Sequence, residues 1–339
     1  VFDISLKDVQ AHNKDMTKLV SIDSIDFNQN LTEDFEDLWS GPSSLRLDNL
    51  SMNGKDESIL IDSFSYNSYI RGLNLYALKG RRDAATQLSA DKLAEEAQSA
   101  LFRGGEGFGA EIVGGLLNSD AMQIELSLSG LELNHEESGR LEEFMIRFDY
   151  DHSKKPDSYS LILKLDGLNY LDQIDSSIPP YFKPKFGNIA LSINNFPLKS
   201  LTSGSIAYLG NTPVDLNEIL LELIYEKSSE IAIEELFVQF KDASVNAKST
   251  ITAVQESPFG FSGNATVEIT GLDKLLIDTT RFSIKNEDSA GLVALLTLAK
   301  GLGKPKINAS GDIAYMFNIV LPPNGDLTIN EVPLGLLSQ

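Results

Sequence analysis

A short motif recurs along this chain: two apolar residues spaced by one, then a turn-forming pair that ends in Asn or Gly, then another apolar residue. The first two apolar side chains lie two positions apart, so they point to one face of a strand. The third breaks that alternation, and the Asn or Gly before it tolerates the positive φ of a bulge or tight bend. The motif therefore predicts a β scaffold in which bends return the third residue to the buried face. Its copies are Leu45–Leu50, Leu126–Leu131, Leu163–Leu168, Leu191–Phe196 and Val267–Leu272.

Between these copies, apolar and polar residues alternate over many short stretches, which is typical of strands with one buried face. The segments 144–150 and 159–165 read as a hairpin, and Asn53-Gly54 marks another because both residues accept the positive φ of a tight turn. The predicted fold class is therefore mainly β with a few helices. We expect long, curved antiparallel sheets that can leave an open groove, with helices packed between sheet segments.

Three stretches favour helix. Residues 83–104 are rich in helix-forming residues, and residues 214–228 and 288–300 carry leucine and isoleucine at helical spacing. Prolines at 179, 180 and 184 mark the best candidate boundary. The sequence thus divides into a β-rich half over 1–178, with a helical insert near 83–104, and a β-rich half over 179–339.

Composition limits the classes of partner. The net charge is −21, which argues against nucleic acid and disfavours electrostatic docking of the chain on anionic lipid. There is no cysteine, so disulfides and thiolate sites are excluded. No run of apolar residues approaches the roughly 18 that a membrane span needs. The chain opens at Val1 inside a strand-like alternation, so we expect it to follow a signal peptide or membrane anchor.

No catalytic, cofactor-binding or metal-binding residue is predicted. The three histidines, His12, His135 and His152, are far apart and show no metal-ligand spacing. The acidic stretch 149–157 lacks the glycine and the final glutamate of a calcium loop, so we interpret it as a solvated hairpin tip. The glycine-rich stretch 104–109 follows a predicted helix and lacks the lysine of a phosphate-binding loop.

Three segments of the sequence resemble a known group of proteins. These are Gly263–Leu276, with its strand followed by Gly-Leu-Asp, the ending Asn324–Leu334, and the segment Ile189–Leu198. They are similar to AsmA-like and YdgA-like bacterial envelope proteins, and the resemblance covers about residues 120–339. It implies long curved antiparallel sheets, an inner-membrane anchor outside this chain, a periplasmic location and, in several relatives, grooves for acyl chains. It carries no catalytic residues, and residues 83–104 have no counterpart in it.

Two functions are therefore expected from the sequence. The first is a non-enzymatic cell-envelope protein, without a cofactor, that binds or carries lipid or another hydrophobic molecule in a β-groove. The alternative is a structural module that binds an envelope protein and no small molecule; a hydrolase is a distant third. The same alternation is also compatible with apolar residues that fill a closed core, so the sequence does not decide between the two functions. The candidate groove residues are Leu126, Leu128, Leu161, Leu163, Leu191 and Ile193.

Overall fold

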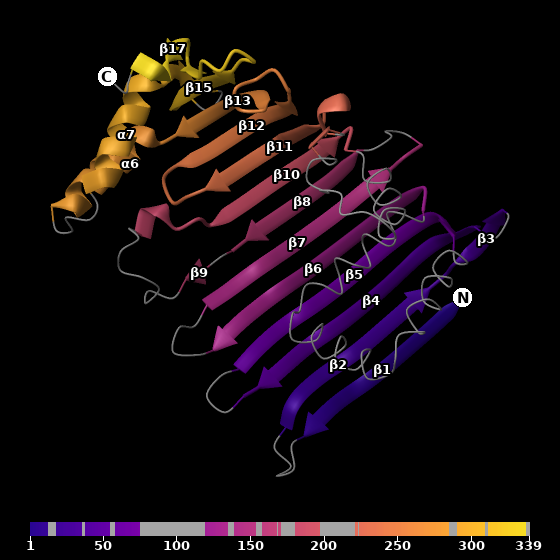
Figure 1. Cartoon of the computed structure of the whole chain (residues 1–339). Coiled ribbons are helices and arrows are strands. Elements are labelled where there is room, and N and C mark those ends of the chain that lie inside the picture. Colours follow the sequence, from indigo (N-terminus) through magenta and orange to yellow (C-terminus); the bar gives the residue numbers. More distant parts are fainter. Residues whose placement is uncertain are drawn as a thin grey trace, which may run out of the picture.

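In the computed structural model the chain forms one broad, open antiparallel sheet (Figure 1). The strands described number seventeen, and all belong to this sheet. The predicted β-rich class with a few helices is therefore confirmed. The structure describes residues 1–12, 18–35, 38–54, 58–74, 119–134, 139–153, 158–167, 169–170, 180–196, 221–222, 224–284, 290–308 and 311–336.

The long strands form a meander in which neighbours in the sheet are successive along the chain. They are β1 (Phe2–His12), β2 (Lys18–Gln29), β4 (Leu38–Asn53), β5 (Ser58–Asn74), β6 (Ala121–Asn134), β7 (Gly139–Asp151), β8 (Tyr159–Asp166), β10 (Phe186–Asn194), β11 (Glu230–Gln239), β12 (Ser244–Ala253), β13 (Phe261–Thr270) and β15 (Ile313–Leu321). Each of these strands pairs antiparallel with the next one in this order.

Short elements complete the sheet and its connections. The strands are β3 (Thr32–Phe35), β9 (Asn169–Tyr170), β14 (Lys304–Ile307), β16 (Thr328–Ile329) and β17 (Val332–Pro333), and the 3-10 turns are η1 (Pro180–Phe182) and η3 (Leu334–Leu336). The pairing of β8 with β10 carries the sheet across the boundary expected between 178 and 179. The division into two halves stays a prediction.

The five copies of the recurrent motif share the backbone feature that their sequence predicts. The residue before the third apolar position has a positive φ in every copy: 53° at Asn49, 63° at Gly130, 62° at Gly167, 56° at Asn195 and 74° at Gly271. Positive φ costs little for glycine and is tolerated by asparagine, which explains why these two residue types occupy the position. The prediction that Gly130, Gly167 and Gly271 depart from regular strand geometry is confirmed.

One copy of the motif begins a helix that the alternation did not predict. Gly271 follows β13 directly and forms the N-cap of α6 (Leu272–Ser283), and Leu272 is buried as the first residue of the helix. The apolar positions 272, 275 and 276 have helical spacing, but the stretch is short and comes after a strong strand signal, so the sequence pattern alone does not indicate this helix.

The structure describes the three predicted helices to different extents. The helix expected at 288–300 is present as α7 (Ala290–Leu302). Of the helix expected at 214–228, the described residues 221–222 and 224–226 are helical. The helix expected at 83–104 lies outside the described residues. Within the described chain, no helix is long and apolar enough to cross a membrane.

Helices α6 and α7 contact each other and lie at the C-terminal end of the sheet (Figure 1). Leu272 of α6 is buried with Tyr315 and Phe317 of β15, and Leu296 and Leu302 of α7 pack against this cluster. The two helices thus close one end of the sheet.

Candidate functional site

The residues expected to line a groove lie on one face of the sheet. Residues directly opposite each other in an antiparallel pair point to the same face. Leu126 of β6 lies opposite Ile146 of β7, which lies opposite Leu163 of β8. Two positions along, Leu128 lies opposite Phe144. Because two positions along a strand restore the same facing, both rows share a face.

The remaining candidates belong to the same face. Leu161 lies two positions from Leu163 on β8 and opposite Leu191 of β10. Ile193 lies opposite Tyr159, again on the same side. All six candidates are half-buried. We call the side of the sheet that they share the apolar face; whether it forms a groove for a ligand stays a prediction.

The apolar face continues towards the N-terminal edge of the sheet. Leu126 lies opposite Tyr66, which lies opposite Leu45. Leu45 in turn lies opposite Phe27, and Phe27 lies opposite Ile4. With strands about 4.8 Å apart, the row from β1 to β10 spans about 34 Å. The sequence analysis did not name the residues of this row on β2, β4, β5 and β7, although the same alternation marks them.

One part of this face is closed by its own aromatic side chains. Met122, Tyr150 and Tyr159 are buried together, and Phe148 stacks on Tyr159 with ring centroids 6.5 Å apart. The Tyr150 hydroxyl is hydrogen-bonded to that of Ser119. Burial raises the pKa of Tyr150 to about 12, because the phenolate would lose its hydration. This cluster is a buried core at one end of the candidate residues.

The same row opens to solvent a few strands away. Ile193 lies opposite Ile231 of β11, which lies opposite Ile251 of β12. Ile231 and Ile251 are 52% and 44% exposed, respectively. The apolar face therefore passes from a packed aromatic cluster to exposed branched aliphatic side chains.

At Gly130 the apolar positions of β6 change parity. Gly130 and Gly167 lie beneath acidic side chains of neighbouring strands: a Cβ on Gly130 would lie 1.9 Å from Asp62 Oδ2, and one on Gly167 would lie 2.3 Å from Glu142 Cγ. Beyond Gly130, the apolar row resumes at Leu131, three positions after Leu128. The positive φ thus coincides with a change in the parity of the apolar positions.

At the C-terminal end, one carboxylate links the two helices to the sheet. Asp273 of α6 accepts hydrogen bonds from the Tyr315 hydroxyl at 3.0 and 3.1 Å, and its Oδ1 lies 2.6 Å from Lys300 Nζ of α7. The hydrogen bond from Lys300, followed by that from Tyr315, holds the pKa of Asp273 below its usual value. The arrangement fixes α6 and α7 relative to β15.

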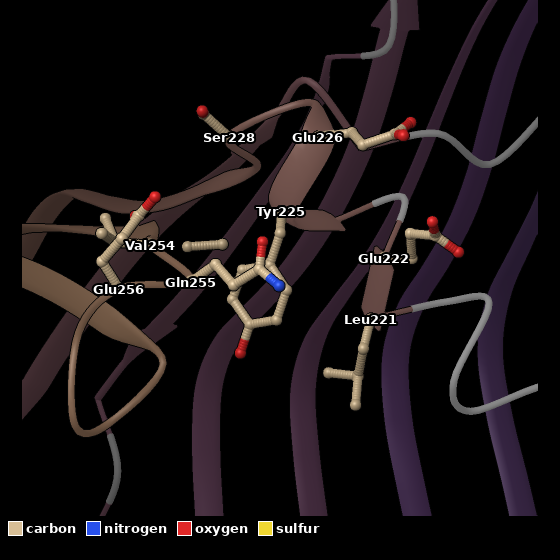
Figure 2. Close-up of a pocket in the computed structure, with 9 residues that line it drawn as sticks. Leu221, Glu222, Tyr225, Glu226, Ser228, Val254, Gln255 and Glu256 are labelled. Carbon is tan, nitrogen blue, oxygen red and sulfur yellow. The ribbon is translucent and has the colours of Figure 1, made fainter.

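A separate cavity of about 640 Å³ lies between residues 221–222 and 225–228 on one side and the turn from β12 to β13 on the other. In Figure 2, Tyr225 and Gln255 occupy its centre, Glu222 and Glu226 lie to one side, and Glu256 lies to the other. Such an acidic, open cavity suits a polar or cationic group better than an acyl chain. Within the described chain, no three His, Asp or Glu side chains are placed to hold a metal ion.

The described histidines lie in different parts of the sheet. His12 ends β1, and His152 lies against the rings of Tyr150 and Tyr159, with centroids 4.9 and 6.0 Å apart. His135 lies outside the described residues. His152 therefore has a packing role in the aromatic cluster.

No family model, curated protein or solved structure shows significant similarity to this chain. Its resemblance to AsmA-like and YdgA-like envelope proteins stays a prediction from the sequence.

Proposed function

We propose that this chain is a non-enzymatic protein of the bacterial cell envelope, facing the periplasm, that binds or carries lipid or another hydrophobic molecule on its apolar face. The observation that carries the proposal is the cross-strand register. It places Leu126, Leu128 and Leu163 on one side of the sheet, together with Leu161, Leu191 and Ile193. The sequence resemblance supports the envelope location and the ligand class.

The energetics support an acyl chain as the ligand. Burying about 20 methylenes at about 0.8 kcal/mol each gives roughly 16 kcal/mol of gross stabilisation. Association costs an estimated 4–15 kcal/mol, so a net gain remains. The exposed pair Ile231 and Ile251 offers apolar surface that a bound chain would remove from water.

A second candidate, a protein-interaction module, is favoured by the edge strand β1. Its Phe2, Ile4 and Leu6 are 55%, 38% and 49% exposed, and the only strand that pairs with it among the described residues is β2. An extended partner segment could add to this edge by backbone hydrogen bonding.

Lipid extraction tests the first proposal against the second. Protein purified without detergent is analysed by native mass spectrometry, and its organic extract is analysed for lipid. We expect a bound mass that is released on extraction, and displacement of a fluorescent fatty acid by that extract. Protein that carries no extractable lipid and binds no fluorescent fatty acid contradicts the lipid proposal and favours the interaction module.

A further inference from the structure

Helix α7 is apolar around its whole circumference and yet has no buried residue. From Ala290 to Ala299 it contains no charged side chain. Leu296 and Leu302 pack towards the sheet, whereas Leu295 and Leu298 point outwards, 66% and 50% exposed. An apolar segment of this length is typical of a buried core helix or of an interfacial segment. Since α7 has no buried residue, it does not fit the buried core helix and fits the interfacial segment better.

Helix α6 and strand β14 extend this surface. Ile277 of α6 and Ile284 at its C-cap are 51% and 81% exposed, and they share an outward stripe with Lys274 and Arg281. Strand β14 comes directly after α7, and its Ile307 is 71% exposed. Basic and apolar side chains thus alternate over one end of the molecule.

The charge of this region is opposite to that of the chain. Residues 272–307 contain six Lys and Arg against four Asp and Glu, a net charge of +2, whereas the whole chain carries −21. Lys300 and Lys304 form ion pairs with Asp273 and Glu331, at 2.6 and 3.6 Å. On the outward stripe of α6, Lys274 pairs with Asp242 at 2.6 Å and Arg281 pairs with Asp278 at 3.8 Å. Exposed ion pairs contribute little, so Lys274 and Arg281 can exchange their partners for lipid phosphates. The region has the mixture of apolar and basic groups found in interfacial helices.

We propose that α6, α7 and β14 dock on the surface of a phospholipid bilayer that contains anionic lipid. Leu295, Leu298, Ile277 and Ile284 enter the headgroup boundary, and Lys274 and Arg281, on the same stripe of α6 as the two isoleucines, face lipid phosphates. The acidic remainder of the chain is repelled by the same surface, so docking orients the molecule with its C-terminal end on the membrane. This inference is independent of whether the apolar face carries lipid.

Vesicle flotation of the full chain tests the proposal. We expect flotation with vesicles of phosphatidylcholine mixed with phosphatidylglycerol, and much less with phosphatidylcholine alone or in roughly 1 M salt. The double variant Leu295→Ser/Leu298→Ser should weaken binding by at least about tenfold, because two apolar anchors are lost. Arg281→Gln should weaken it about fivefold, from about 1 kcal/mol per basic residue.

Matched variants separate docking from general effects. Leu60→Ser/Leu133→Ser removes two exposed leucines of β5 and β6, away from the helices, and Lys248→Gln removes an exposed lysine of β12. Both should float like the parent. In Leu298→Trp, tryptophan emission should shift to the blue on anionic vesicles beyond any shift from Trp39, the single native tryptophan. This variant serves as the readout if the serine variant unfolds.

Three outcomes would overturn the docking proposal: no flotation of the parent at low salt, equal loss in the matched controls, or no blue shift at position 298. A dimer in solution that the double serine variant dissociates, without vesicle binding by the parent, would assign the surface to self-association instead. Fluorescent fatty acid binding is measured in parallel. If the parent floats with vesicles but binds no fluorescent fatty acid, the result contradicts lipid binding on the apolar face and leaves the docking proposal standing.

Discussion

Asp62 of β5 lies directly over Gly130 of β6, leaving no room for a side chain on the glycine. A Cβ at this position would lie 1.9 Å from the Asp62 carboxylate oxygen and 2.8 Å from its Cβ. The backbone of Gly130 also has a φ of 63°, which an L-residue adopts only with strain. Two independent features therefore require glycine here.

We expect Gly130→Ala to destabilise the fold by about 1–3 kcal/mol, and Gly130→Val to cost at least as much. Gly139→Ala is the matched control, because a Cβ there meets no atom within 4 Å and its φ is not positive. The measurement is urea unfolding of all three variants. Equal stability of Gly130→Ala and Gly139→Ala would contradict the requirement for glycine.

The positive φ values were predictable from the sequence because asparagine and glycine precede the third apolar residue in all five copies of the motif. The element that comes after each bend was not predictable in this way. After Gly130 the chain continues as a strand, whereas after Gly271 it enters α6. The six residues after Gly271 allow helical spacing, and the burial of Leu272 against Tyr315 and Phe317, distant in sequence, favours the helix.

The shared face of the candidate residues was partly predictable. Period-two alternation marks one face of each strand, but it does not show which faces of different strands lie on the same side of the sheet. The register of the paired strands shows this, because it places Leu161 opposite Leu191 and Leu126 in the same row as Leu163. The exposed surface of α7 was not foreseen, because an apolar stripe alone suggests packing on the sheet.

Substitutions on the apolar face should separate ligand binding from folding. Leu128→Asp and Leu163→Asp place a charge among half-buried apolar side chains, so we expect loss of lipid pull-down with the sheet retained by circular dichroism. Ser127→Asp adds the same charge at the residue before Leu128, which points to the opposite face, and this variant should keep the lipid. If both aspartate variants unfold and the parent carries no lipid, the residues form a structural core.

Alkaline pH should destabilise the aromatic cluster through Tyr150. Its pKa is about 12 in the folded chain, against an ordinary value of about 10 when unfolded. The neutral phenol is therefore favoured by folding, and its contribution is complete below pH 10 and is lost as pH rises towards 12. Urea unfolding at stepped pH should show a shallower alkaline loss for Tyr150→Phe than for the parent. Tyr69→Phe, at an exposed position, is the control and should retain the parent slope.

Acid should loosen the helical end of the molecule through Asp273. Its pKa is held below the usual value of 3.8 by Lys300 and Tyr315, so folding favours the carboxylate. The resulting stabilisation is present above pH 3.8 and is lost as pH falls through the lower folded value. Asp273→Asn should be less stable than the parent at pH 7, and the difference should shrink as pH falls below 3.8. Hydrogen exchange of α6 and α7 measures this loss locally, with Asp326→Asn as the control. A difference that does not change with pH would show that the Asp273 charge contributes nothing.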